Sequence, residues 1–163
     1  MNIRIGFGFD VHQLQEGKDL WLGGVKLNHT KGAVGHSDAD VLIHAICDAL
    51  LGAAGKNDIG FYFPNTSREF KNIDSKILLK RVMDLLDEDN YGVGNIDCSI
   101  VLEQPKILPY IELMKKTLVP ILNIGIEDIS IKATTNEKLG YVGREEGVCA
   151  YAVVLINKRE IIH

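Results

Sequence analysis

The segment HSDADVLIHAICDALLGAAG, at positions 36–55, constrains the fold more than any other part of the chain. Its pattern predicts a helix with Ser37 as the N-cap. This helix is apolar on nearly every side, so it belongs inside a core. The exception is one polar stripe, because Asp40, His44 and Asp48 recur at intervals of four. A buried charge without a partner costs on the order of several kcal/mol, so we expect a neighbouring element to supply partners.

The stretch GFGFDVHQL, at positions 6–14, offers such partners within a strand predicted over 2–13. Side chains on a strand alternate between its faces, so Asp10 and His12 point one way and Phe9 and Val11 the other. Asp10, His12 and His44 could form a structural hydrogen-bonded cluster. They could also form the set of two histidines and one carboxylate that is common in catalytic zinc sites, although such spacing more often belongs to a structural cluster. Spacing alone leaves both interpretations open.

The remaining pattern alternates strands and helices without a strict βα repeat. It predicts a hairpin over 19–27 turning at Gly23 and Gly24, a long loop over 56–73, helices over 74–89 and 107–123, and strands over 94–104, 128–136 and 148–157. We expect an α/β chain of the α+β type, a two-layer sandwich with helices on one face of a mixed sheet, in a single catalytic domain over 1–163. The last strand is apolar on both sides, which favours self-association over the face without helices.

Composition narrows the classes of function. A formal net charge of −4 gives no basic field for nucleic acid, and no apolar run approaches the ~20 residues that span a membrane. Cys47, Cys98 and Cys149 are widely spaced in apolar surroundings, as free thiols in a reducing cytosol would be. The start MNIRIGFGFD shows no leader sequence. This favours a bacterial cytoplasmic protein, although a processed plastid form would look the same.

Two further polar segments are ambiguous by themselves. KATTNE, at positions 132–137, could hold phosphates and a hard divalent ion at a strand end, or serve only as turn chemistry. LEQPKILP, at positions 102–109, could line a pocket or simply connect a strand to a helix.

Four motifs, in order and spacing, resemble the 2-C-methyl-D-erythritol 2,4-cyclodiphosphate synthase family. They are GFDVH, HSDADVLIHAICDALLGAAGKNDIGFYFP, QPKILP and KATTNEKLGYVGREEG, and they extend over essentially the whole chain. The resemblance implies a lyase of the non-mevalonate isoprenoid pathway. Its substrate would be 4-diphosphocytidyl-2-C-methyl-D-erythritol 2-phosphate, and its products the cyclic diphosphate and CMP.

The resemblance also implies roles for individual residues. Zinc would be bound by Asp10, His12 and His44, and a second divalent cation, Mg²⁺ or Mn²⁺, by Glu137. His36 and Thr135 would be catalytic. The implied substrate-binding residues are Asp10, His12, His36, Ser37, Asp58, Ile59, Gly60, Phe63, Pro64, Asn65, Thr66, Ser67, Leu102, Gln104, Pro105, Lys106, Ile107, Leu108, Thr134, Thr135, Asn136, Glu137, Tyr141 and Arg144. Among these, 102–108 would form the cytosine pocket, and His36 and Ser37 would bind phosphate at a helix N-terminus.

The family assembles as homotrimers whose active sites are shared between subunits. Phe9, Arg144 and Glu146 match positions that line a central channel in such trimers. That channel could take an isoprenoid diphosphate, although trimer packing and salt bridges are the plainer interpretation.

The chain departs from the family pattern at a few positions. Ala39 replaces a glycine, which we expect to be harmless at a helix start, while Asn65 and Ser67 replace two acids and Asn136 replaces a threonine. Two other functions fit the same residues. One is a zinc hydrolase acting on a different phosphate ester, and the other is a trimeric binding protein with structural zinc.

Overall fold

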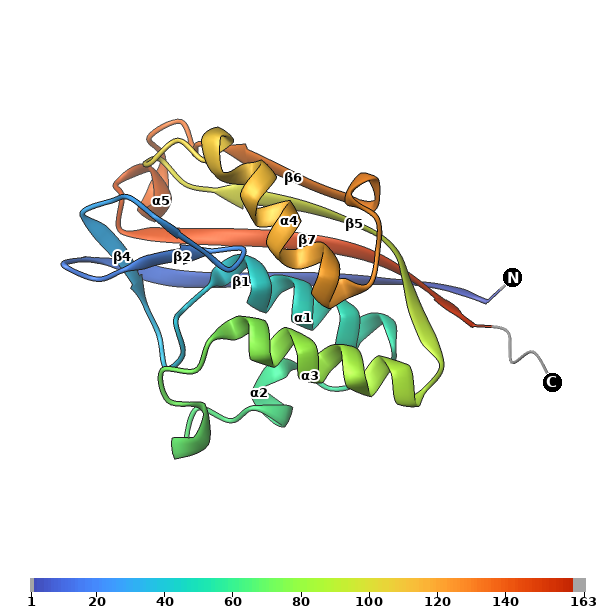
Figure 1. Ribbon diagram of the computed structural model, residues 1–163. Helices are drawn as coiled ribbons and strands as arrows, with labels where there is room; N and C mark the ends of the chain where they lie inside the picture. The colour runs from blue at the N-terminus through green and yellow to red at the C-terminus, as the bar shows by residue number, and fades with distance from the viewer. Residues whose placement is uncertain (1, 160–163) are drawn as a thin grey trace.

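A five-stranded sheet forms one layer of the structure, a computed structural model that describes residues 2–159 (Figure 1). The strands lie in the order β4-β1-β7-β5-β6. They are β1 (Ile3–Glu16), β4 (Lys31–Val34), β5 (Tyr91–Val101), β6 (Ile129–Thr134) and β7 (Gly147–Lys158). Strands β5 and β6 are parallel and the other neighbours antiparallel, so the sheet is mixed, as predicted. Strands β2 (Leu20–Leu22) and β3 (Val25–Leu27) form the predicted hairpin outside it.

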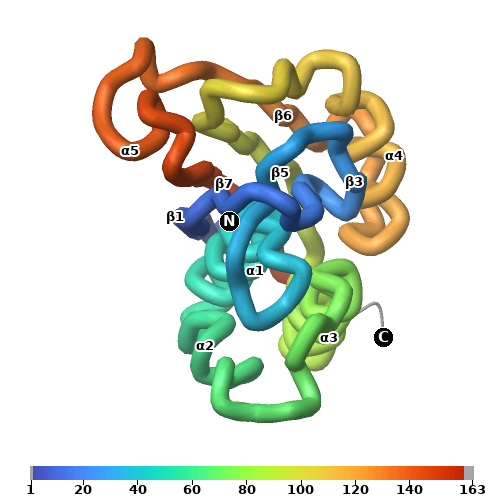
Figure 2. Tube along the Cα trace, turned by 90° about the vertical axis from the view of Figure 1, so that its left-hand side faces the viewer, coloured from blue at the N-terminus to red at the C-terminus, as the bar shows by residue number. Residues whose placement is uncertain are grey.

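Three helices form the second layer. They are α1 (Val41–Ala53), α3 (Ser75–Glu88) and α4 (Ile111–Leu122), and all lie on the same face of the sheet (Figure 1). Viewed end on, α1 lies between strand β1 on one side and α3 and the short helix α2 (Ile59–Tyr62) on the other (Figure 2). Its side chains are almost all buried, so the helix predicted to be core is core. The predicted two-layer arrangement of a mixed sheet and helices is confirmed.

Some predicted boundaries were wrong. The predicted loop over 56–73 contains the short helix α2 (Ile59–Tyr62) and a 3₁₀ turn (Arg68–Phe70). Strand β5 begins at Tyr91 and not at 94, because the glycine-rich YGVG continues the strand through a bulge between Val93 and Asn95. The remaining short helical elements are α5 (Gly140–Gly143) and the 3₁₀ turns Leu108–Tyr110 and Ile126–Asp128.

Helix α1 begins at Val41 with Asp40 as its N-cap, so the predicted cap at Ser37 was wrong. The Asp40 carboxylate is fully buried. It accepts hydrogen bonds from the backbone N–H of Ile43 at 3.0 Å, of Gly23 at 2.9 Å and of Gly24 at 2.7 Å. One side chain therefore caps α1 and fixes the tip of the β2-β3 hairpin, which explains why a carboxylate is tolerated in the core.

The opposite face of the sheet is open and apolar. As predicted from the alternation on β1, Phe9 and Val11 point to this face, and Phe7 beside them is 62% exposed. Tyr151 of β7 continues the patch, with its ring centroid 5.0 Å from that of Phe9. The apolar side chains exposed on β1 and β7 are Ile3, Ile5, Phe7, Phe9, Val11, Tyr151 and Val153. A continuous exposed patch of this kind marks an interaction surface.

Two further predictions concern the chain as a whole. Cys47, Cys98 and Cys149 are free and buried, as expected. Among the described residues, no helix combines the length and apolar character needed to cross a bilayer.

Candidate active site

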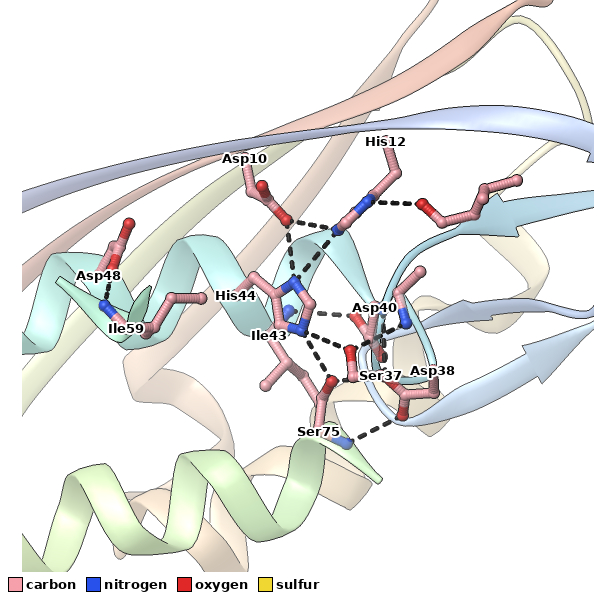
Figure 3. Close-up of polar contacts among 12 residues, drawn as sticks. Asp10, His12, Ser37, Asp38, Asp40, Ile43, His44, Asp48, Ile59 and Ser75 are labelled. Atoms are coloured by element: carbon pink, nitrogen blue, oxygen red, sulfur yellow. Dashed lines mark hydrogen bonds and ion pairs between the residues drawn. The ribbon is translucent and has the colours of Figure 1, made fainter. Parts of the chain in front are cut away.

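The candidate site forms where β1 and α1 come unusually close together. Gly6 and Gly8 face α1, and a Cβ built on them would lie 1.8 Å from the carbonyl oxygen of Ala49 and 1.9 Å from that of Ala45. The absence of side chains at these two positions therefore lets the helix rest directly on the strand. Two residues further along the same face, Asp10 and His12 meet His44 of α1 (Figure 3).

Three ligand atoms converge there. Asp10 Oδ2 lies 2.9 Å from His12 Nε2 and 3.0 Å from His44 Nδ1, and the two ring nitrogens are 3.2 Å apart. These three residues form a group whose ligand atoms all lie within 4.8 Å of one another. A tetrahedral zinc ion with ligand bonds of 2.0–2.1 Å requires about 3.3 Å between its ligand atoms. The observed triangle is close to that size, so the donor set fits a divalent metal ion.

The outer nitrogens of both rings are occupied by protein partners. His12 Nδ1 lies 3.0 Å from the carbonyl oxygen of Val34, which can only accept a hydrogen bond, so Nδ1 is the donor. When the ring is neutral, this leaves the lone pair of His12 on Nε2, facing the other ligand atoms. His44 Nε2 lies 2.9 Å from Ser75 Oγ and 3.2 Å from Ser37 Oγ. Both rings are therefore oriented by contacts outside the ligand triangle.

The charges of the site reinforce one another. Burial acts to raise the pKa of Asp10, but hydrogen bonds from His12 and His44 outweigh it and lower that pKa to about 2. Burial acts to lower the pKa of His12, but the hydrogen bond and charge of Asp10 outweigh it and raise that pKa. Asp10 is thus an anion at the centre of the cluster, and a carboxylate anion is a suitable ligand for a cation.

A cavity of about 420 Å³ opens over this cluster. It contains many of the predicted substrate-binding residues: Asp10, His12, His36, Ser37, Ile59, Gly60, Phe63 and Asn65. His44 and Asp48 also line it, so the polar stripe of α1 is split: Asp40 caps the helix, while the other two face the cavity.

His36 and Ser37 line the cavity, but not in the predicted way. They precede the helix by several residues in an irregular segment, so they do not lie in the first turn of α1, where the sequence placed them. Their role in phosphate binding stays a prediction. His36 Nε2 lies 3.0 Å from the carbonyl oxygen of Ser67.

Ala39 follows with φ of +56°, in the left-handed region that favours glycine, where an L-residue is disfavoured by about 1–2 kcal/mol. Its methyl group is buried, which offsets part of that cost.

The segment with the predicted substrate contacts at 58–67 is shaped by its own caps. Asp58 caps α2 by accepting a hydrogen bond from Phe61 N, and Ser67 caps the following 3₁₀ turn. Asp48 accepts a hydrogen bond from Ile59 N at 2.8 Å and thereby ties α2 to α1. Burial raises the pKa of Asp48, although this amide acts in the opposite direction. Asp58, Pro64, Thr66 and Ser67 are not among the residues that line the cavity.

A second hollow, of about 210 Å³, lies elsewhere on the chain. Its lining includes the predicted residues Leu102, Pro105, Lys106, Ile107, Leu108, Thr134 and Thr135. Gln104, Asn136 and Glu137 are not among them. The cavity and this hollow share no lining residue, so one chain does not bring all the predicted substrate-binding residues together.

The turn after β6 is held by a residue that sequence reasoning missed. Glu103 Oε1 accepts hydrogen bonds from Asn136 N at 2.8 Å and Lys138 N at 3.2 Å. Glu137 is exposed, lies outside the cluster of three metal ligands and has φ of +51°. Its Oε1 lies 3.4 Å from Thr135 Oγ1. The predicted second metal ligand is thus presented on an ordered turn.

The predicted channel residues lie on the open side of the molecule. A hollow of about 640 Å³ is lined by two of them, Phe9 and Glu146. Its other lining residues are Tyr141, which was predicted to bind substrate, and Val11, His12, Gln13 and Gly147. Arg144 is not among the lining residues; its Nε donates to Glu146 Oε1 at 2.9 Å.

The mixed sheet with helices on one face makes this an α+β protein, and the two histidines and one carboxylate under its cavity fit a divalent metal ion. The YgbB family model matches residues 3–157, and the chain belongs to this family. Two relatives carry the name 2-C-methyl-D-erythritol 2,4-cyclodiphosphate synthase. The protein from Bacteroides thetaiotaomicron is 62% identical, over 97% of this chain and 99% of its own length. The protein from Parabacteroides distasonis is 63% identical, over 97% of this chain and 98% of its own length.

Solved structures agree with these relatives. The bifunctional IspDF from Campylobacter jejuni aligns with a TM-score of 0.93 and 40% identity over 97% of this chain, which spans only 43% of that longer protein. IspF from Plasmodium falciparum, solved as a CDP complex, aligns with a TM-score of 0.86 and 36% identity, over 98% of both chains.

Proposed function

We propose that the protein converts 4-diphosphocytidyl-2-C-methyl-D-erythritol 2-phosphate into 2-C-methyl-D-erythritol 2,4-cyclodiphosphate and CMP, as a lyase of isoprenoid biosynthesis. The observation that carries the proposal is the convergence of Asp10 Oδ2, His12 Nε2 and His44 Nδ1 beneath a cavity that also contains His36 and Ser37. Relatives more than 60% identical over nearly the full length carry the name of this activity. These two relatives are bacterial, and together with the nucleotide substrate they favour a cytoplasmic location.

The reaction is an intramolecular phosphoryl transfer. An oxygen of the 2-phosphate attacks the β-phosphorus, and the bond from that phosphorus to the bridging oxygen breaks, so CMP leaves with that oxygen. No covalent intermediate with the protein is needed, and positioning and charge neutralisation dominate. Zinc bound by Asp10, His12 and His44 would supply a Lewis acid and a template for phosphate.

Side chains from the cavity, from the second hollow and from the segment 58–67 would position the substrate. His36 and Thr135 would donate hydrogen bonds to the charge that develops at the β-phosphate. Asp58, on the segment that Asp48 ties to α1, would accept hydrogen bonds from hydroxyl groups of the erythritol. Asn65 lines the cavity and can replace a carboxylate as a hydrogen-bond partner, but not as a charge.

The cytidine end of the substrate would occupy the second hollow. Leu102, Ile107 and Leu108 offer apolar contact to the base, and Lys106 offers a positive charge to the phosphates. Two solved relatives are described as CDP-bound, which supports a cytidine site in this family. Glu137, exposed on the turn after β6, would hold Mg²⁺ or Mn²⁺ against the diphosphate.

A homotrimer would bring the two halves of the site together. The cavity and the cytidine hollow share no lining residue, and the apolar face of β1 and β7 is uncovered in the single chain. Packing three copies through that face would bury it and set the hollow of one subunit against the cavity of the next. Where the subunits meet, we favour trimer packing and the Arg144–Glu146 ion pair over binding of an isoprenoid diphosphate.

Phosphorus NMR of the purified zinc-loaded protein with this substrate, with and without Mg²⁺, tests the proposal. Appearance of CMP together with a cyclic diphosphate is expected. Inorganic phosphate or a linear product would indicate a hydrolase instead. An unchanged substrate would contradict the activity and direct attention to Asn65 and Ser67, where the family has acids.

A further inference from the structure

His44 has a carboxylate at one ring nitrogen and a serine at the other, and that serine contacts a second carboxylate. Asp10 Oδ2 lies 3.0 Å from Nδ1, while Ser75 Oγ lies 2.9 Å from Nε2 (Figure 3). Ser75 leads to the second carboxylate, that of Asp38. A neutral imidazole carries one proton, on either Nδ1 or Nε2, and only the nitrogen without the proton can bind a metal ion. The proton on Nε2 leaves Nδ1 free for the metal, whereas the proton on Nδ1 donates to Asp10 and blocks it.

The contacts of Ser75 decide the direction of its hydrogen bond to His44. Ser75 is fully buried. Its backbone N–H donates to Asp38 Oδ2 at 2.9 Å, and its hydroxyl makes a very short contact with Asp38 Oδ1. An ionised carboxylate only accepts, so the single hydroxyl proton of Ser75 is donated to Asp38. The Ser75 oxygen then has only lone pairs to offer to His44, so this contact is a hydrogen bond when His44 Nε2 carries the proton.

We propose that Asp38 and Ser75 are positioning residues that hold His44 with its proton on Nε2, against the pull of Asp10, and so keep Nδ1 available for metal. The inference rests on the metal site of the proposed function. Ser37 Oγ, at 3.2 Å from the same nitrogen, is a second and longer contact on that side of the ring. Outer partners of this kind typically change metal affinity by about 10–100-fold.

The same pair links the metal ligand to the substrate segment. Ser75 is the first residue of α3, and Asp38 N donates to the carbonyl oxygen of Ile73 at 3.1 Å. Phe70 and Ile73, which follow the segment 58–67, line the cavity over the metal site. Asp38 and Ser75 therefore contribute both to the orientation of His44 and to the position of the cavity wall.

The test uses Ser75→Ala and the isosteric Asp38→Asn, with Asp74→Ala as the matched control. Asp74 is the N-cap of the same helix and accepts from Lys76 N at 2.9 Å, but it makes no contact with His44. The control therefore loosens the start of α3 without touching the Asp38–Ser75 pair. Two quantities are measured for each protein: the zinc dissociation constant by chelator competition, and the His44 tautomer by nitrogen NMR of the metal-free protein at a pH where the ring is neutral.

We expect both test variants to bind zinc about 10–100-fold more weakly and to shift His44 toward the form with the proton on Nδ1. The control should leave both quantities at the wild-type values. A His44 that stays protonated on Nε2 in both test variants would overturn the proposal. An equal loss of affinity in Asp74→Ala would also overturn it, because helix packing alone would then explain the effect. If the wild type bound no zinc, the metal site would fail, but the tautomer measurement would still decide the role of the pair.

Discussion

Gly8 lies directly against the backbone of Ala45, so that a Cβ at position 8 would stand 1.9 Å from the Ala45 carbonyl oxygen. This contact sets the spacing between β1 and α1, and that spacing brings Asp10 and His12 within hydrogen-bonding distance of His44. Gly8→Ala should therefore lower the free energy of unfolding by at least about 3 kcal/mol, because the clash involves backbone on both sides. Denaturant unfolding monitored by circular dichroism measures it.

Gly52→Ala is the matched control for this prediction. Gly52 lies on the exposed side of the same helix, and a Cβ there would meet nothing within 4 Å. This substitution should raise the free energy of unfolding by about 0.5–1 kcal/mol, because alanine is the better helix former. Equal effects of the two substitutions would show that the close approach of β1 and α1 does not limit stability.

His44→Ala should abolish tight zinc binding and nearly all turnover while the assembly survives. The substitution removes one of three converging ligand atoms, and the side chain lies on the helix layer, away from the apolar face of the sheet. Zinc content measured by atomic absorption, together with size-exclusion chromatography with light scattering, checks both parts. One zinc per subunit retained in the variant would contradict the ligand assignment.

Glu137→Gln should weaken the dependence of turnover on added Mg²⁺ without removing zinc. Glu137 lies outside the three-ligand cluster, and its amide isostere keeps the shape but loses the charge that a hard cation needs. Activity is titrated against Mg²⁺ at constant zinc, with Lys138→Gln as a neighbouring control on the same turn. A magnesium response identical to that of the wild type would count against the role.

The sequence predicted those parts of the site that depend on local periodicity. Alternation along β1 placed Asp10 and His12 on one face, and the four-residue interval on α1 placed His44 and Asp48 on one stripe. The interval could not show that Asp40 turns away to cap the helix and bind the hairpin at Gly23 and Gly24.

The residues that sequence reasoning missed act through contacts between distant segments. Ser75 reaches His44 from 31 positions away, and Glu103 reaches Asn136 from 33. Neither interval corresponds to a repeat of a helix or strand, so no local pattern signals it.

Ala39 was predicted to be harmless at a helix start. It has a left-handed φ of +56° and lies directly before Asp40, the N-cap of α1.

Phe7→Glu should dissociate the proposed homotrimer. Phe7 is 62% exposed at the centre of the apolar side chains on β1, and burying a carboxylate there without a partner is strongly unfavourable. Ile77→Glu is the control, since Ile77 is 47% exposed but lies on helix α3, on the other side of the molecule. Light scattering should give the mass of a monomer for the first variant and of a trimer for the second. A trimer for both would place the interface elsewhere.

The cysteines should be unreactive in the folded protein. Burial raises the pKa of Cys98 to about 12, raises that of Cys47 well above its ordinary value and also raises that of Cys149. The reactive form is the thiolate, and a pKa of about 12 leaves only about one thiol in ten thousand ionised at pH 8. Ellman's reagent at pH 8 should therefore modify the native protein very slowly and all three thiols rapidly once guanidinium is added. A single thiol that reacted at once in the native state would contradict this prediction and would indicate a nucleophilic cysteine, which the proposed phosphoryl transfer does not need.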